Sequence, residues 1–182
     1  MTFLTKEKFD EHVNEFQKRF PKVQHWTENR WIYHEMAVNI LKENMKKGDK
    51  ILEIGPAGVK LVEGSDVLDY AVPKANWPIQ NPTYIHDAKK IPWPISDCQY
   101  DFVVALRVFQ HLAPVQKEAF QETARISKNV LIVVPSQYVT TPIGSQGIDK
   151  SAFLTWNNGR EPTKYISTGH GDVYFWNAQA LR

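Results

Sequence analysis

The chain has 182 residues, enough for one domain with a sizeable buried core. Its hydrophobic residues (42%) and charged residues (23%) are typical of soluble globular proteins, and no apolar run of about 18 residues could span a membrane. The net charge of +2 is too balanced to indicate nucleic-acid binding, and Cys98, the only cysteine, can form no internal disulfide. With no secretory signal at the N-terminus, these features predict a cytoplasmic protein without nucleic-acid or membrane partners.

Two helices are predicted before residue 48. Four apolar residues between Phe9 and Phe20 recur at intervals of three and four positions, and Pro21 ends that stripe. A second helix is predicted from about residue 28 to residue 47, with Thr27 as a candidate N-cap.

Five short apolar segments follow and are predicted to be buried strands. The fourth of them, 100–106, is nearly all apolar, which is typical of a parallel strand that is covered on both faces. Residues 90–94 are expected to be a loop because they contain two prolines, and a helix is expected from Pro114 onward. This pattern predicts an α/β fold with an open, mainly parallel Rossmann-like sheet flanked by helices. The predicted strands are 51–55, 67–69, 83–86, 100–106 and 130–134.

The last 46 residues are punctuated by glycine and proline, which predicts an irregular tail. Residues 165–166 and 173–176 could pair as a hairpin across Gly169–Gly171. We therefore expect a single domain, 1–182, in three parts: a helical segment (1–47), a cofactor-binding α/β core (48–136) and the tail (137–182).

Acidic residues end or follow three consecutive predicted strands: Glu53, Asp69 and Asp87. Ligands of open parallel sheets bind beyond the carboxyl ends of the strands, so these carboxylates should line one edge. They would repel the pyrophosphate of a dinucleotide, and Pro56 removes a backbone N–H that could bind it. The ammonium, sulfonium, ribose hydroxyls and adenine amine of S-adenosylmethionine suit carboxylates, so this ligand is favoured over NAD.

Five segments occur in the order and spacing of known motifs: ILEIGPAG (51–58), VLDY (67–70), HDAKKIPWP (86–94), YDFVVALRVFQHL (100–112) and RISKNVLIVVPS (125–136). Together they resemble class I S-adenosylmethionine-dependent methyltransferases over about half of the chain. The resemblance implies S-adenosylmethionine as the cofactor, with Asp69 at the ribose and Asp87 at the adenine amine. The residues expected to bind the cofactor are Glu53, Gly55, Ala57, Gly58, Asp69, Tyr70, Asp87, Ala88 and Arg107.

The sequence departs from this family near the first motif. The family usually has glycines at the positions of Ala57 and Val59. Only the ten residues 56–65 connect the first two predicted strands, fewer than a parallel crossover usually needs. The helix of this crossover should therefore have one or two turns at most, or be absent.

The C-terminus departs as well. The family has two further strands, and residues 176–181 resemble the start of the helix that leads to them, so the chain is predicted to be short at this end. Strand 130–134 would then have an open apolar edge, and a homodimer or another partner is expected to cover it unless the tail hairpin does so.

The predicted function is methyl transfer to a small molecule, with His111 and His170 as candidate bases for an oxygen or nitrogen acceptor. Packing of His111 at a helix start is the alternative. No spacing resembles a metal site. Two other functions stay open: a cofactor-binding protein without turnover, and a dinucleotide- or nucleotide-sugar-binding Rossmann enzyme.

Overall fold

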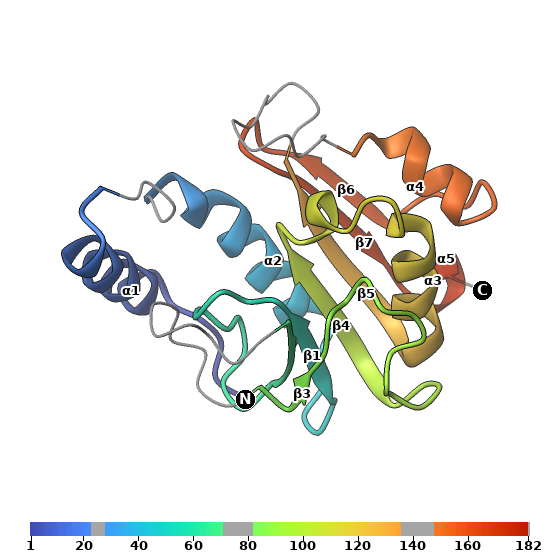
Figure 1. The fold of residues 1–182 in the computed structure, drawn as a ribbon, viewed down its shortest axis with the longest axis horizontal. Helices are drawn as coiled ribbons and strands as arrows, with labels where there is room; N and C mark the ends of the chain where they lie inside the picture. The colour runs from blue at the N-terminus through green and yellow to red at the C-terminus, as the bar shows by residue number, and fades with distance from the viewer. Residues whose placement is uncertain (23–27, 71–81, 136–147, 182) are drawn as a thin grey trace.

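The computed structural model describes residues 1–22, 28–70, 82–135 and 148–181. Its centre is one seven-stranded sheet in the order β3-β2-β1-β4-β5-β7-β6 (Figure 1). Neighbouring strands from β3 to β5 are parallel, whereas β7 is antiparallel to both β5 and β6. The predicted mainly parallel α/β sheet is confirmed. The strands are β1 (Ile51–Ile54), β2 (Asp66–Asp69), β3 (Tyr84–Ile85), β4 (Tyr100–Leu106), β5 (Ser127–Val134), β6 (Lys164–Ser167) and β7 (Asp172–Trp176).

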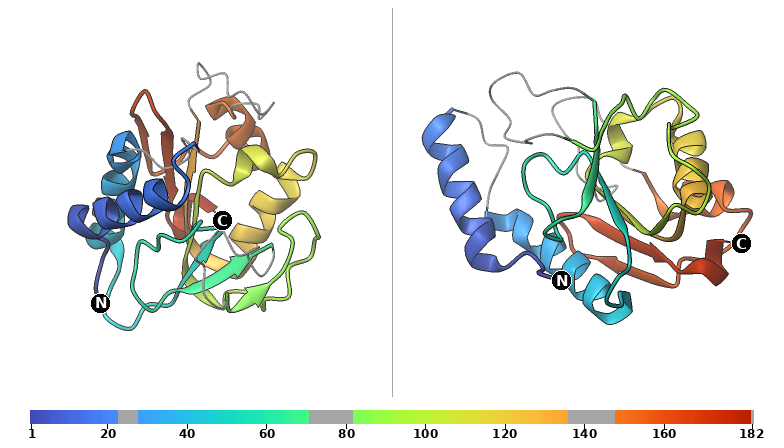
Figure 2. Two further views of the ribbon diagram at one scale, coloured as in Figure 1. Left: turned by 60° about the vertical axis from the view of Figure 1, so that its left-hand side comes forward. Right: turned by 90° about the horizontal axis from the view of Figure 1, so that it is seen from below.

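Helices flank the sheet, and the two views of Figure 2 show α1 and α2 on the side away from α3 and α4. The two predicted N-terminal helices are present, while the candidate N-cap Thr27 lies outside the described residues. Among the described residues, no helix combines the length and the apolar character that crossing a bilayer requires. The helices are α1 (Lys6–Arg19), η1 (Glu28–Arg30), α2 (Trp31–Asn44), η2 (Phe109–His111), α3 (Gln116–Ile126), α4 (Lys150–Trp156) and α5 (Ala178–Leu181).

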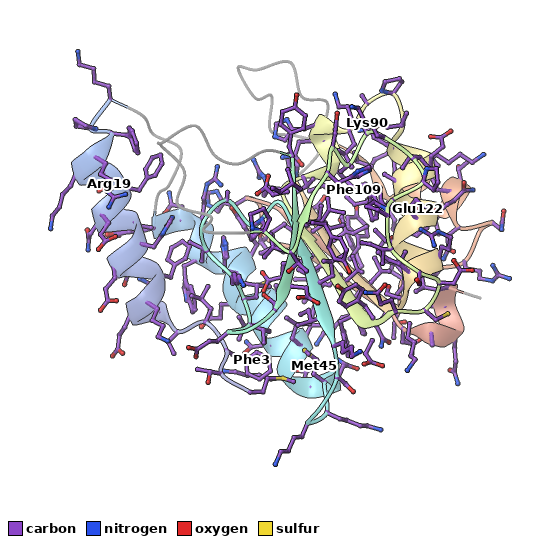
Figure 3. The ribbon with its side chains drawn as sticks, turned by 60° about the horizontal axis from the view of Figure 1, so that its bottom comes forward. Phe3, Arg19, Met45, Lys90, Phe109 and Glu122 are labelled. Carbon is purple, nitrogen blue, oxygen red and sulfur yellow. The ribbon has the colours of Figure 1, made fainter. Side chains whose placement is uncertain are left out.

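Successive residues of the central strands belong to two different apolar cores. In β4, Phe102 packs in the core under α2, and Val103 packs in the core under α3, α4 and α5. Phe109, labelled in Figure 3, belongs to the second core, whereas Phe3 and Met45 pack against the first. Because both faces of the sheet are covered, β4 and β5 read as almost continuous apolar runs in the sequence.

The C-terminal region corrects two predictions. The hairpin predicted there is present as β6 and β7, but these are the very strands that were expected to be missing, so the sheet is not short. The helix predicted over 176–181 is present as α5, but it follows β7 instead of preceding the last two strands. Helix α4, capped by Asp149, was also missed in what was predicted to be an irregular tail. Pairing of β7 with β5 is a long-range contact, which local patterns do not reveal.

The edge of β5 is covered within the chain. Residues Val130 to Val134 pair with Trp176 to Asp172 in antiparallel register. The prediction that a homodimer or another partner covers this edge is therefore wrong, and the tail closes the sheet itself. The physical reason is that β7 satisfies the N–H and C=O groups that an open edge would have offered to another molecule.

Candidate functional site

The carboxyl ends of β1, β2 and β3 are joined by backbone hydrogen bonds. The Gly55 N–H donates to the Leu68 carbonyl at 2.9 Å, and the His86 N–H donates to the Asp69 carbonyl at 2.8 Å. The glycine loop, Asp69 and the segment containing Asp87 therefore meet at one edge of the sheet, as the strand order predicted.

The loop after β1 is wound by left-handed backbone. Gly55, Ala57 and Gly58 have φ angles of 52°, 52° and 92°. For Ala57 this conformation costs about 1–2 kcal/mol, because a side chain with a Cβ crowds its own carbonyl there. A Cβ on Gly55 would lie 3.2 Å from the Val108 Cγ2, so β4's following segment closes on this loop. No helix occurs between β1 and β2, in agreement with the predicted short or absent crossover helix.

The N-terminal segment takes the place of that helix. The Leu4 N–H donates to the Leu61 carbonyl at 2.8 Å, and the Glu63 N–H donates to the Thr2 carbonyl at 2.9 Å. Val59 packs against the buried face of α1, which consists of Phe9, Val13 and Phe16. The apolar stripe of α1 is thus used to hold the connection between β1 and β2.

Glu53 has a structural role that the sequence reasoning missed. Its carboxylate is buried and accepts the Leu61 N–H at 3.0 and 2.8 Å and the Val62 N–H at 3.0 Å. Burial raises the pKa of Glu53, and the two backbone N–H groups oppose this shift. The carboxylate therefore anchors the far end of the loop, and its direct contact with a cofactor stays a prediction. The short crossover of ten residues could have indicated this role, because backbone N–H groups that are not in a helix need another acceptor.

The two other acids retain acceptor capacity at the edge. Asp69 is half-buried and accepts the Tyr70 N–H at 2.7 Å, and burial raises the pKa of its carboxyl. Asp87 accepts the Lys89 N–H at 3.0 Å within a turn. Next to it, Ala88 is buried and its carbonyl accepts the Trp93 Nε1–H, whereas Tyr70 is 70% exposed. Each carboxylate can accept further hydrogen bonds, as ligand hydroxyls or an amine would require.

The segment after β4 brings Arg107, His111 and the turn at His170 together. The Arg107 Nη1 donates to the His170 carbonyl at 2.7 Å, so the backbone of His170 is used while its imidazole is exposed. The Gln110 amide donates to the Arg107 carbonyl at 2.6 Å and lies 3.3 Å from the His111 Nε2. Burial, Arg107 and Lys89 lower the pKa of His111, which leaves a neutral imidazole with a proton-accepting nitrogen near pH 7.

Tyr33 also lies beside this region. It is buried on α2, and the Arg107 Cζ lies 5.9 Å from the centroid of its ring. Nothing in the spacing of the sequence connects residue 33 with residue 107, because the contact depends on how α2 packs across β5 and β7.

Comparisons with known proteins find similarity only in structure. No protein-family model matches the chain, and no curated protein matches it. A methyltransferase from Aquifex aeolicus described as SAM-dependent has a TM-score of 0.55 and 13% identity, covering 94% of this chain and 97% of that one. A structure of the Haloferax volcanii Trm112 methyltransferase activator with a putative methyltransferase gives 0.61 and 13%, covering 96% and 97%. Magnesium protoporphyrin IX methyltransferase from Synechocystis, with bound SAM, gives 0.55 and 12%, covering 93% of both chains.

Proposed function

We propose that this chain, which has the fold of the class I S-adenosylmethionine-dependent methyltransferases, binds S-adenosylmethionine and transfers its methyl group to a small molecule. The observation that carries the proposal is the junction of the left-handed loop 55–58 with Asp69, through the Gly55–Leu68 hydrogen bond. At this junction a ligand can come close to the backbone of the glycine loop while its hydroxyls reach the half-buried Asp69 carboxylate. A nucleoside with ribose hydroxyls needs both features.

The residues at this edge fit the cofactor part by part. Asp69 would accept the ribose hydroxyls and Asp87 the adenine amine, with Tyr70 and Ala88 beside the adenine. Gly55, Ala57 and Gly58 would border the methionine end, where Glu53 fixes the loop and could accept a hydrogen bond from the ammonium.

When bound, S-adenosylmethionine supplies a methyl group that is already activated on a sulfonium. The protein then has to align the acceptor with the methyl and exclude water. For an acceptor that must lose a proton, the His111 Nε2 is the proposed base, because its lowered pKa keeps it unprotonated. His170 is the second candidate, since the Arg107 bond to its carbonyl holds its turn at the same edge.

Binding without turnover is the second candidate function. The strained Ala57 in the loop favours it, because the family usually has glycine there and the methionine end of the cofactor would border this residue. Binding and turnover are separated by measuring methyl transfer with a panel of small acceptors after binding has been established.

Calorimetric titration with S-adenosylhomocysteine tests the proposal. Asp69→Ala should weaken binding by at least tenfold, because each lost hydrogen bond to a charged acceptor contributes roughly 1.5–3 kcal/mol. Asp97→Ala removes an exposed carboxylate before β4 and serves as the matched control. Tighter binding of NAD than of S-adenosylhomocysteine, or equal affinity in Asp69→Ala and the wild type, would contradict the proposal.

A further inference from the structure

The guanidinium of Arg107 is half-buried, and the part of the chain that the structure describes offers it no ion-pair partner. Its Nη1 donates to the His170 carbonyl at 2.7 Å and its Cζ lies 5.9 Å from the Tyr33 ring centroid. The Nε–H is buried and finds no acceptor among the described residues. Within the same residues, no carboxylate lies at ion-pair distance from Arg107. A charged donor that is buried without an acceptor costs free energy, and an anionic ligand that accepted a hydrogen bond from it would remove this cost.

Among the described residues, the charged side chains that act on Arg107 and His111 are cationic. Arg30 at the start of α2 acts with burial to lower the pKa of Arg107. Arg107 and Lys89 both act with burial to lower the pKa of His111. The one opposing influence on Arg107 comes from the Tyr33 hydroxyl, which is neutral at pH 7 because the ordinary pKa of a tyrosine is near 10 and burial raises that of Tyr33 further. This group of residues therefore attracts an anion, and Arg107 offers it a fixed, planar set of donors.

The side-chain contacts of Arg107 lie across β4 from the acids proposed to bind the cofactor. β4 has β1 on one side and β5 on the other. The acids proposed to bind the cofactor follow β1, β2 and β3. Arg107 instead makes its contacts toward β5 and β7: its N–H donates to the Val133 carbonyl at 2.7 Å, and its side chain reaches the turn between β6 and β7.

That turn is held tightly against the same side. A Cβ on Gly171 would lie 3.1 Å from the Val133 Cγ1 and 3.4 Å from the Tyr33 Cδ1. The backbone at His170 therefore has little freedom to move, and the Arg107 side chain is positioned before any ligand binds.

We propose that Arg107 binds a carboxylate or phosphate group of the methyl acceptor, so that the small molecule methylated by this chain is an anion. The inference rests on the proposed function and changes the predicted role of Arg107 from a cofactor ligand to an acceptor ligand. Lys89 and His111 add positive charge, and His111 is then near the acceptor that it would deprotonate.

The anion site can be tested with inorganic phosphate as the probe. The melting temperature of the chain is followed during a phosphate titration at constant ionic strength, with and without saturating S-adenosylhomocysteine. We expect phosphate to stabilise the wild type and Arg107→Gln to weaken its apparent affinity by about tenfold or more. Arg107→Lys keeps the positive charge but loses the planar set of guanidinium donors, so it should give an intermediate effect. Lys47→Gln removes one exposed charge before β1, at the opposite edge, and should match the wild type.

Nucleoside ligands show whether Arg107 binds an anionic acceptor or the carboxylate of the cofactor. 5′-Methylthioadenosine lacks the amino-acid carboxylate of S-adenosylhomocysteine. If Arg107→Gln weakens binding of S-adenosylhomocysteine but not of 5′-methylthioadenosine, Arg107 binds the cofactor and our proposal is overturned. Equal phosphate effects in the wild type and Arg107→Gln, or no effect in the wild type, also overturn it. If the wild type does not bind S-adenosylhomocysteine, the proposed function fails, whereas the titration without nucleoside still tests the anion site. Should Arg107→Gln fail to fold, Arg107→Lys carries the comparison.

Discussion

The β4–β5 half and the β1–β3 half of the sheet share an apolar core but differ in what else stabilises them. On one side, β4 and β5 have seven and eight residues and pack against a group of aromatic rings on α3, α4 and β7. On the other side, β1 and β2 have four residues each, β3 has two, and no helix connects β1 with β2. The second half contributes Leu52, Ile54 and Leu68 to the same core, and it depends in addition on the buried Glu53 carboxylate and on pairing with the N-terminal segment.

This difference separates the stability of the fold from the proposed site. Apolar packing on the β4–β5 side is non-directional and large in total, whereas the loop beside Asp69 is positioned by a few directed hydrogen bonds. Segments with few apolar contacts are the ones that open most easily, and binding loops are commonly of this kind. The following variants test whether the two halves can be perturbed separately.

The largest effect is expected from Phe153→Ala on α4. The Phe153 ring is 1% exposed and lies 4.7 Å from the Tyr174 ring and 5.3 Å from the Trp176 ring, measured between centroids. Removing it should lower the free energy of unfolding by about 3–5 kcal/mol in urea denaturation. Ile85→Ala, at a residue that is 60% exposed, is the control and should change stability little. A loss below 1 kcal/mol for Phe153→Ala would show that this packing is not what stabilises the half.

Glu53→Ala should have the next largest effect. It leaves the Leu61 and Val62 N–H groups buried without their acceptor, which costs roughly 1–3 kcal/mol each. Because the mutation also removes the desolvation cost of a buried carboxylate, a net loss of about 2–4 kcal/mol is expected. Unlike Phe153→Ala, it should also weaken binding of S-adenosylhomocysteine, because the loop loses its anchor. Glu63→Ala, an exposed neighbour, should change neither quantity.

The pH dependence of stability gives an independent reading of Glu53. Because burial raises its pKa above the ordinary 4.5, the folded chain holds this proton more tightly than the unfolded chain does. The contribution of Glu53 to stability therefore falls as the pH rises from 4.5 through the raised pKa. Subtracting the urea-derived free energies of Glu53→Ala from those of the wild type should show this decline, and a difference that grows with pH would contradict it.

The sequence was sufficient to predict β4 and β5, but not what pairs with them. The apolar run Tyr100 to Leu106 is buried on both faces, so its composition alone predicts a central strand. The segment Val173 to Trp176 was predicted to form a hairpin that could cover β5, but the sequence left open whether the hairpin or a partner does so. The pairing spans roughly 40 residues of chain, so local patterns do not decide it. For the site, carboxylates after consecutive strands were identified from their order. The contacts of Arg107 with Tyr33 and His170 come from packing between distant segments, and no local pattern encodes them.

A smaller effect, confined to binding, is expected from Gly58→Val. Gly58 and Gly48 both have left-handed backbone, with φ angles of 92° and 99°, so a valine strains both positions by a similar amount. A Cβ on Gly48 would meet nothing within 4 Å. We expect the two variants to melt at similar temperatures, but only Gly58→Val to weaken S-adenosylhomocysteine binding, by roughly tenfold or about 1.4 kcal/mol. Equal affinities in the two variants would place the loop away from the ligand.

The smallest effect is a change in one titration, and it sharpens the comparison at the edge itself. Glu53, Asp69 and Asp87 lie on the β1–β3 side, whereas Arg107 and His111 follow β4 and form a cationic group with Lys89, which comes from the turn of Asp87. Burial, Arg107 and Lys89 lower the pKa of His111, so its NMR titration midpoint should lie below 6.5, with assignment from His111→Gln. Since an unfolded histidine titrates near 6.5, the contribution of His111 to stability is lost as the pH falls from 6.5 through the lowered pKa. Arg107→Gln should move the midpoint upward, because one of the two cationic causes is gone, whereas Lys47→Gln should not. A midpoint at or above 6.5, or one that Arg107→Gln leaves unchanged, would show that the two sides of the edge are not electrostatically distinct.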